Sequence, residues 1–258
     1  MNVEIREVDI VNKIEIKVLN PEVVSDAEKM MVFCARLTQR GHGIHNMNDL
    51  VELLDAPYQP KTMEAMTKLP HPTIQKFGVI NVAVVGASRR FLAQITRHQN
   101  EVKFMSASLQ YSDYSGQADF CVPYDILRCG RGVVDRYNVV CREAMEEYAD
   151  AIEAGIDNDA AGYMAPQGLR NILIISATPY QWKHMISQRT CRRNTAETRY
   201  VMLLIWKELA KLGGMFKDCG PFCMDGACPE GKMTCGKPID SGWGPEDILK
   251  ADFPEVCK

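Results

Sequence analysis

Residues 77–98, FGVINVAVVGASRRFLAQITRH, join two elements of different period. Residues 77–85 form an apolar run that predicts a strand, whereas residues 87–98 predict an amphipathic helix. In that helix Phe91 and Ile95 recur at helical spacing and should face the core. A strand that leads into a helix, in a chain with further strands and long helices, predicts an α+β architecture with a mixed sheet.

The opposite face of this helix is polar. Arg90, Gln94 and Arg97 stand four and three residues apart and therefore share one face. An arginine fork suits a phosphate or a pyrimidine carbonyl, and a glutamine both donates and accepts hydrogen bonds. His98 can contact a ligand's ring or phosphate, or act as a proton donor. These residue types suggest a nucleotide site, although the spacing alone favours a solvated basic face on a surface helix.

Periodicity predicts the remaining elements. They are a strand within residues 1–19, a helix starting at Ser25, a short helix at 50–54, a strand at 119–123, a long helix over 134–152, and a strand or helix at 171–176. Thr178 and Pro179 should start a further helix with a bend near residues 190–195. In that helix Glu197 could pair with Arg193, four residues earlier.

Length and composition bound the class of protein. A chain of 258 residues, 46% hydrophobic and 24% charged, supports one large globular domain or two small ones. The net charge of −3 argues against a general nucleic-acid binder. The sequence contains no glycine motif of the dinucleotide-binding or P-loop type. Because neither a signal peptide nor an apolar stretch of about 20 residues is evident, we expect a cytoplasmic protein with no membrane partner.

Ten cysteines fall into two groups. Those scattered among apolar segments are expected to be mostly buried small hydrophobes. Four others crowd into a Gly- and Pro-rich tail: Cys219, Cys223, Cys228 and Cys235. Four thiols there could close a tetrahedral zinc site, but their spacings are not the usual C-x2-C pairs. Free thiols in a surface loop, or disulfides formed after lysis, are the alternatives.

The region after residue 90 resembles the signature of the flavin-dependent thymidylate synthases. That signature is R-H-R, seven residues, then S, with a glutamine three residues before it and an R-Y-S tail after it. The matching residues are Gln94, Arg97, His98, Ser108, Tyr111 and Ser112. This chain has Gln99 in place of the second arginine, Gln110 in place of the arginine before the tyrosine, and a gap one residue longer.

Partial matches in the same order extend the resemblance over most of residues 30–210. The further matching segments are residues 35–36, 69–73, 165–169 and 188–199, which resemble the family's A-R, G-H-x-S/T, L-P-Q-G-L and L-R to A-Q-x-E-I-R segments. Lys76 and Phe77 stand where the family has E-H. Several ordered matches are more specific than any one of them.

The resemblance implies a flavin-dependent thymidylate synthase-like fold, with a catalytic domain in residues 1–215 and a Cys-rich extension in residues 216–258. It implies synthesis of dTMP from dUMP, with methylenetetrahydrofolate as the one-carbon donor, NADPH as reductant and FAD as cofactor. The implied assembly is a homotetramer with shared active sites. Its partners would be small molecules and not nucleic acids.

The resemblance also implies roles for individual residues. Arg199, Arg97 and Ser108 are the implied catalytic residues: the two arginines would stabilise negative charge on the pyrimidine, and Ser108 would position dUMP. The implied dUMP-binding residues are Gln94, Arg97, Ser108, Gln110, Tyr111 and Arg199. The implied FAD-binding residues are His71, Thr73, Arg97, His98, Gln99, Ser106 and His184.

Two other functions remain open from the sequence. Gln99, Gln110, Lys76 and Phe77 replace family residues, so the chain could be a divergent paralogue that binds nucleotide or folate without flavin chemistry. Alternatively, the Cys-rich tail could be the working surface of a zinc-stabilised interaction protein.

Overall fold

The computed structural model describes residues 4–6, 14–69 and 71–254. At its centre is a four-stranded sheet with the strand order β2 (Glu15–Val18), β3 (Ile80–Ser88), β6 (Arg170–Ala177) and β4 (Val102–Ser106). All three pairings in this sheet are antiparallel. Outside it, β1 (Glu4–Arg6) and β5 (Gln117–Asp119) pair in parallel. The predicted α+β architecture is confirmed, but the central sheet is antiparallel and not mixed.

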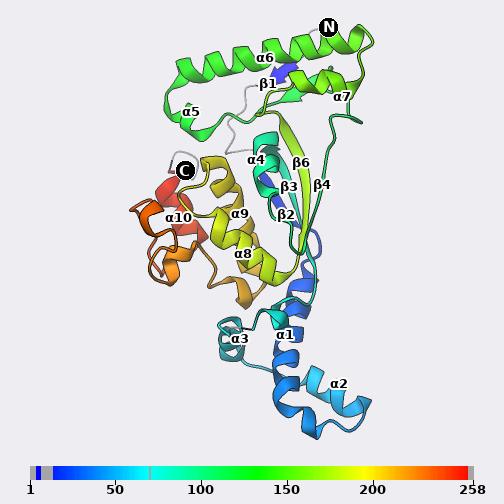
Figure 1. Ribbon diagram of the computed structural model, residues 1–258, viewed down its shortest axis with the longest axis vertical. Helices are drawn as coiled ribbons and strands as arrows, with labels where there is room; N and C mark the ends of the chain where they lie inside the picture. Colours follow the sequence, from blue (N-terminus) through cyan, green and yellow to red (C-terminus); the bar gives the residue numbers. More distant parts are fainter. Residues whose placement is uncertain (1–3, 7–13, 70, 255–258) are drawn as a thin grey trace.

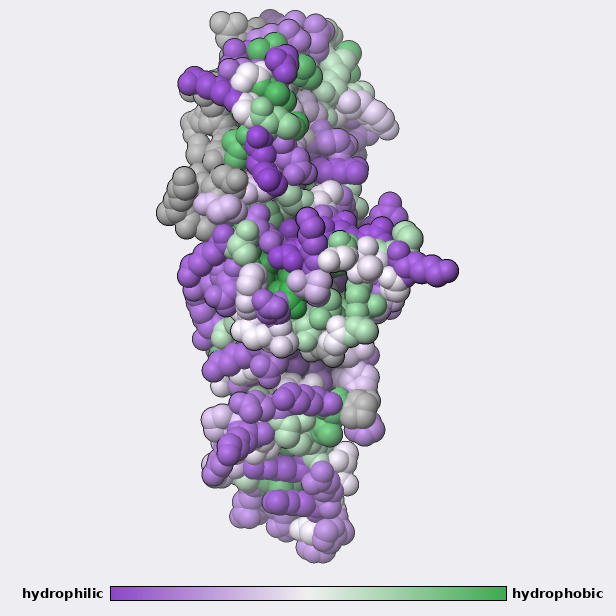
Figure 2. Space-filling model, turned by 90° about the vertical axis from the view of Figure 1, so that its left-hand side faces the viewer, coloured by the Kyte–Doolittle hydropathy of each residue, from purple (hydrophilic) through white to green (hydrophobic). Residues whose placement is uncertain are grey.

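The helices gather into three groups around the sheet (Figure 1). One face is covered by α4 (Arg89–Ile95), α8 (Pro179–Arg189) and α9 (Ala196–Leu212), and α10 (Pro245–Asp252) packs against α9. One end carries α1 (Glu22–Arg40), α2 (Met47–Asp55) and α3 (Pro60–Thr67), and the other carries α5 (Tyr124–Arg128), α6 (Arg131–Glu153) and α7 (Asn158–Ala161). The 3-10 helices are η1 (Gly41–Gly43), η2 (Pro72–Gln75), η3 (Gly162–Met164), η4 (Gly214–Phe216), η5 (Phe222–Asp225) and η6 (Gly231–Met233). Figure 2 shows an elongated outline, with mostly hydrophilic residues over the end formed by α1 and α2.

A β-bulge sets the point where β3 turns into α4. The pairing of β3 with β6 shifts register between Val85 and Ala87. Gly86 lies in this shift with a φ of 90°, a conformation that glycine adopts without a steric penalty. Because a bulge bends its strand, this one redirects the chain just before α4. The helix expected over residues 87–98 ends at Ile95, so α4 carries Arg90 and Gln94 but not Arg97.

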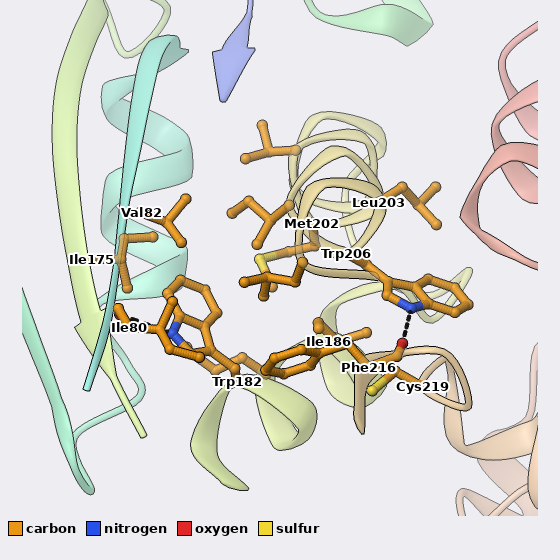
Figure 3. Close-up of a cluster of buried hydrophobic side chains, with 14 of the residues drawn as sticks. Ile80, Val82, Ile175, Trp182, Ile186, Met202, Leu203, Trp206, Phe216 and Cys219 are labelled. Atoms are coloured by element: carbon orange, nitrogen blue, oxygen red, sulfur yellow. Dashed lines mark hydrogen bonds between the residues drawn. The ribbon is translucent and has the colours of Figure 1, made fainter. Parts of the chain in front are cut away.

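The main core lies between the sheet and the helices α8 and α9 (Figure 3). Trp182 of α8 and Trp206 of α9 are fully buried. Their indole nitrogens donate hydrogen bonds to the carbonyls of Ile80 (3.0 Å) and Phe216 (2.8 Å), as a buried tryptophan requires. The second hydrogen bond ties α9 to η4, at the start of the C-terminal segment.

A second, smaller core lies against α6. Its buried residues are Ala118, Phe120, Cys141, Met145, Tyr148, Ala149, Ala151, Ala161 and Leu169. Cys141, Met145 and Tyr148 stand on α6 at helical spacing, so the amphipathic helix predicted over residues 134–152 is confirmed.

The sequence patterns predicted where most elements lie, but several of their boundaries differ in the structure. β6 and the bend between α8 and α9 are found where they were expected. α1 begins at Glu22 and not at Ser25, and the strand expected at 119–123 is β5, with only an isolated bridge beyond it. The part of the strand expected in residues 1–3 and 7–13 lies outside the described residues. β4, α3 and α10 were not predicted. Within the described ranges, no helix is both long and apolar enough to cross a membrane.

Candidate functional site

Ser88 and Glu197 join the start of α4 to α9. The Ser88 hydroxyl accepts a hydrogen bond from the Phe91 amide (3.1 Å) and so caps α4. The Ser88 amide and hydroxyl both donate to the Glu197 carboxylate, at 2.7 and 2.6 Å. Burial raises the pKa of Glu197, and the hydrogen bonds from Ser88 oppose that rise. The expected pairing of Glu197 with Arg193 is therefore wrong, and Arg193 instead lies 3.9 Å from Glu230 of the tail.

Gln94, near the end of α4, contacts the beginning of α9. Its Oε1 accepts hydrogen bonds from the hydroxyls of Thr198 (2.8 Å) and Thr195 (3.2 Å). Because its oxygen is held by these two hydroxyls, the side-chain amide has a defined orientation. Its NH2 group can therefore be offered to a carbonyl oxygen of a ligand.

The buried His98 and the half-buried Arg189 form a polar pair. Arg189 Nε donates to His98 Nε2 at 2.8 Å, and Arg189 Nη2 donates to the Gln94 carbonyl at 3.0 Å. His98 is 7% exposed, and its ring meets that of His184 edge to face at 5.9 Å. Burial, followed by the charges of Arg189 and His184, lowers the pKa of His98 to about 4. His98 is therefore a neutral imidazole at neutral pH, with its proton on Nδ1 because Nε2 accepts from Arg189.

This lowered pKa predicts an acid-sensitive contribution to stability. The unfolded chain binds a proton at His98 near the ordinary value of 6.5, whereas the folded chain does not until about 4. The contribution of His98 is therefore complete above pH 6.5 and is lost as the pH falls from 6.5 towards 4. Urea unfolding should show that wild type loses about 2 kcal/mol more than His98→Gln between about pH 7.5 and pH 5. Parallel losses in the two proteins would contradict the assignment.

Arg97 and Gln99, on either side of His98, are exposed. Arg97 makes no hydrogen bond or ion pair with the described part of the chain. By contrast, all four arginines between residues 189 and 199 bind groups of the protein. Arg97 is thus open to an anionic ligand.

The segment after β4 carries the other residues implied for dUMP. Ser108 Oγ accepts a hydrogen bond from the Gln110 amide (3.1 Å), which closes a tight turn. Tyr111 is 82% exposed, and Ser106 is half-buried at the end of β4. Leu109 packs on the smaller core against α6. No hydrogen bond or ion pair between described residues links this turn to Arg97 or His98.

His71 and Thr73 are exposed at η2. Lys76, just after η2, forms an ion pair with Glu101 at 2.6 Å. Glu101 follows the turn that carries His98, so this ion pair holds η2 at the same end of the sheet as His98. Lys76, which stands where the resembled family has the glutamate of its E-H pair, is thus paired with Glu101.

The arginines after α8 are bound by the C-terminal tail. Arg199 is only 8% exposed and is paired with Asp252 of α10. Arg192 pairs with the same carboxylate at 2.8 Å. Sequence reasoning did not find Asp252, because it lies more than fifty residues from both arginines and no local pattern marks it.

Three of the four tail cysteines line a cavity, and the four do not form the zinc site that the sequence left possible. Across residues 4–6, 14–69 and 71–254, no three His, Cys, Asp or Glu side chains are grouped so as to hold a metal ion. Cys219 is buried in the main core, whereas Cys235 is exposed with its Sγ 3.5 Å from the Lys237 carbonyl. Cys219, one of the four cysteines proposed as zinc ligands, is therefore part of the core. The cavity, of about 490 Å³, lies between the α8–α9 turn and the tail, and its cysteines are Cys191, Cys223, Cys228 and Cys235.

Comparison with known proteins relates this arrangement to one family. The sequence model of the family described as thymidylate synthase complementing protein matches residues 21–212 of the chain. The matched range contains α4, α8 and α9, and with them the contacts among Gln94, His98 and Arg189.

Curated relatives are similar over most of the chain. The flavin-dependent thymidylate synthase of Geobacter sulfurreducens is 27% identical over 220 residues, which are 82% of this chain and 90% of that protein. The Clostridium tetani protein of the same name is 24% identical over 241 residues, 86% of this chain and 94% of that one. Among solved structures, the UMP/dUMP methylase PolB from Streptomyces cacaoi, bound with 5-Br dUMP, has a TM-score of 0.66 at 16% identity, covering 83% of this chain and 95% of that one. The last similarity shows a shared fold.

Proposed function

This chain belongs to the thymidylate synthase complementing protein family, and we propose that it synthesises dTMP from dUMP in a flavin-dependent reaction. The proposed cofactor is FAD, the one-carbon donor is methylenetetrahydrofolate and the reductant is NADPH. The observation that carries the proposal is the cluster of Gln94, Arg97, His98 and Arg189, within the matched region. We also propose that the enzyme is cytoplasmic and that its partners are small molecules.

The side chains of this cluster can stabilise a pyrimidine anion. The exposed guanidinium of Arg97 can bind the uracil carbonyls or phosphate of dUMP, and its charge would stabilise the negative charge that makes C5 nucleophilic. The oriented amide of Gln94 can donate to a second uracil acceptor. His98, as a neutral imidazole, can donate from Nδ1 but would not protonate a substrate at neutral pH. Ser108, whose hydroxyl accepts from the Gln110 amide, is proposed to position dUMP and not to act as a nucleophile.

The donors of this region fit a flavin. A flavin offers a planar ring with carbonyl and N–H edges as well as phosphate groups, and Arg97 and neutral His98 supply donors for both. The further residues proposed to hold it are His71, Thr73, Gln99, Ser106 and His184, which are all exposed or half-buried. When bound, FAD would supply the hydride that completes the methyl group.

An uncovered apolar face of the sheet supports the proposed homotetramer. Val85 and Ile172 pair across β3 and β6 and are 41% and 52% exposed, and Met105 of β4 is 73% exposed. The opposite face of these strands is buried under α4, α8 and α9. Contiguous exposed apolar side chains of this kind are typical of protein–protein interfaces. Further copies covering this face would also bring the Ser108 turn of one chain towards another chain.

A charge on this face should therefore dissociate the assembly. Ile172→Glu would bury a carboxylate in the interface, at a cost of several kcal/mol, and is expected to yield dimers or monomers. Light scattering coupled to gel filtration measures the mass. Ile156→Glu, at another apolar side chain of similar exposure (45%), is the control and should leave the mass unchanged. A wild type that is already monomeric would contradict the proposed assembly.

The proposed function is tested by absorption spectroscopy and then by activity. Purified protein should show a bound-flavin spectrum after addition of FAD, and the spectrum should change when dUMP is added. Release of tritium from dUMP labelled at C5, dependent on methylenetetrahydrofolate and NADPH, would establish the reaction. A protein that binds dUMP but takes up no FAD would instead be the divergent paralogue that Gln99 and Gln110 suggest. A protein that binds neither would refute both.

A further inference from the structure

The C-terminal helix α10 places one carboxylate between Arg192 and Arg199, the second of which is an implied dUMP-binding residue. Arg192 Nε and Nη2 donate to the two oxygens of Asp252, at 3.1 and 2.8 Å. Arg199 Nη2 donates to the same carboxylate. Arg192 comes from the α8–α9 turn and Arg199 from α9, so Asp252 joins two guanidinium groups that belong to different elements. Asp252 itself lies beyond the family match, which ends at residue 212.

Asp252 is held in place by the packing of α10. The next residue, Phe253, is 1% exposed, and its ring meets those of Tyr124 at 5.0 Å and Tyr200 at 5.3 Å. The Arg199 guanidinium lies 5.4 Å from the centre of the Phe253 ring. A carboxylate anchored beside a buried aromatic residue is a fixed counter-charge and not a mobile one.

Asp252 leaves one donor of Arg199 unoccupied. Arg199 Nε donates to the Thr190 carbonyl at 3.3 Å and Nη2 to Asp252, whereas Nη1 has no partner among the described residues. Arg199 lines a cavity of about 720 Å³, in which Asp252 is the sole acidic side chain among the described lining residues. The other basic residues that line the cavity are Arg128, Arg192 and Lys237. A cavity with four basic side chains and one acid suits an anionic ligand.

We infer that Asp252 is a positioning residue for Arg199 in dUMP binding, an inference that rests on the proposed function. Two guanidinium groups this close repel each other, and a bridging carboxylate removes that repulsion while fixing both forks. Burial alone would raise the pKa of Asp252, but the hydrogen bonds from Arg192 and Arg199 lower it overall, so the carboxylate is ionised at neutral pH. Without this charge, Arg199 would lose the contact that holds its Nη2 and would keep only the hydrogen bond from Nε to the Thr190 carbonyl.

Asp252→Asn tests the inference, with Glu246→Gln as the matched control. Glu246 lies on the same helix, where it pairs with Lys207 at 3.0 Å, and it has no part in the proposed site. Titration calorimetry with dUMP and the tritium-release assay give the dUMP Kd, KM and kcat of the holoenzyme. We expect Asp252→Asn to raise the Kd and KM for dUMP about tenfold or more, with unchanged flavin content. Asp252→Glu should recover part of the affinity, which a purely structural role would not require.

The dUMP affinity of Asp252→Asn relative to the control decides whether Asp252 positions Arg199. If Asp252→Asn binds dUMP within about twofold of Glu246→Gln, the inference is overturned and the proposed function stands. If wild type neither binds dUMP nor releases tritium, the proposed function fails and the inference with it. If Asp252→Asn does not fold, Arg192→Lys replaces it, because lysine breaks the two-point contact but keeps both Asp252 and Arg199. The Kd for dUMP should then rise about threefold or more, and an unchanged Kd overturns the inference.

Discussion

A chain that ends at residue 215 is expected to be largely unfolded. The removed segment contributes Phe216, Ile239, Ile248, Leu249 and Phe253 to the main core, each at most 4% exposed. Burial of one such side chain is worth about 1.5–3 kcal/mol, so their sum is comparable with the whole stability of an ordinary domain, about 5–15 kcal/mol. Far-UV circular dichroism and urea unfolding would show the loss of a cooperative transition.

A single substitution tests, without a truncation, whether the C-terminal segment stabilises the core. Phe253→Ala removes the ring that packs on Tyr124 and Tyr200 and should cost about 3–5 kcal/mol. Met233→Ala, at a tail position that is 60% exposed, is the control and should change stability by less than about 0.5 kcal/mol. Cooperative unfolding of the truncated chain at wild-type urea concentrations would show instead that the tail is an independent extension.

Replacement of Arg97 by alanine should affect activity strongly and stability hardly at all. Arg97 is exposed and has no partner within the described residues, so the fold loses no contact that the structure shows. The proposed enzyme loses a charge-assisted contact to dUMP worth about 1.5–3 kcal/mol, which corresponds to about a tenfold to a hundredfold fall in kcat/KM. Steady-state kinetics with dUMP as the varied substrate measures the fall.

Arg142→Ala is the matched control for Arg97→Ala. Arg142 is also exposed, but it lies on α6 and outside the proposed site. Both variants should unfold at the wild-type urea concentration, which separates a binding defect from a folding defect. If Arg97→Ala keeps kcat/KM within about twofold of Arg142→Ala, Arg97 is not a dUMP ligand.

Sequence patterns predicted those helices and strands that are specified by residues only a few positions apart. Thr178 caps α8 by accepting a hydrogen bond from the Gln181 amide (3.4 Å), with Pro179 in the first turn. The apolar stripe of α6 likewise depends on residues three or four apart. The predicted boundary between residues 215 and 216 remains a prediction, although the core of the protein continues across it.

The contacts that build the candidate site join distant parts of the chain. Ser88 and Glu197 are separated by 109 residues, Gln94 and Thr198 by 104, and His98 and Arg189 by 91. No hydrophobic period or capping rule reports a contact at such a separation. The expected Arg193–Glu197 pair is the instructive error, because helical spacing permits it but the hydrogen bonds from Ser88 hold Glu197 elsewhere.

The sequence by itself determined the α+β class, the order of most elements, and the segment of Gln94, Arg97 and His98 that resembles the family signature. These properties follow from side-chain periodicity and from residue identity, which are local. Only the tertiary structure decided that His98 is neutral, that Arg199 is paired with Asp252 and that Cys219 belongs to the core. Each of these depends on burial or on a partner from another part of the chain, and both arise only when the chain folds.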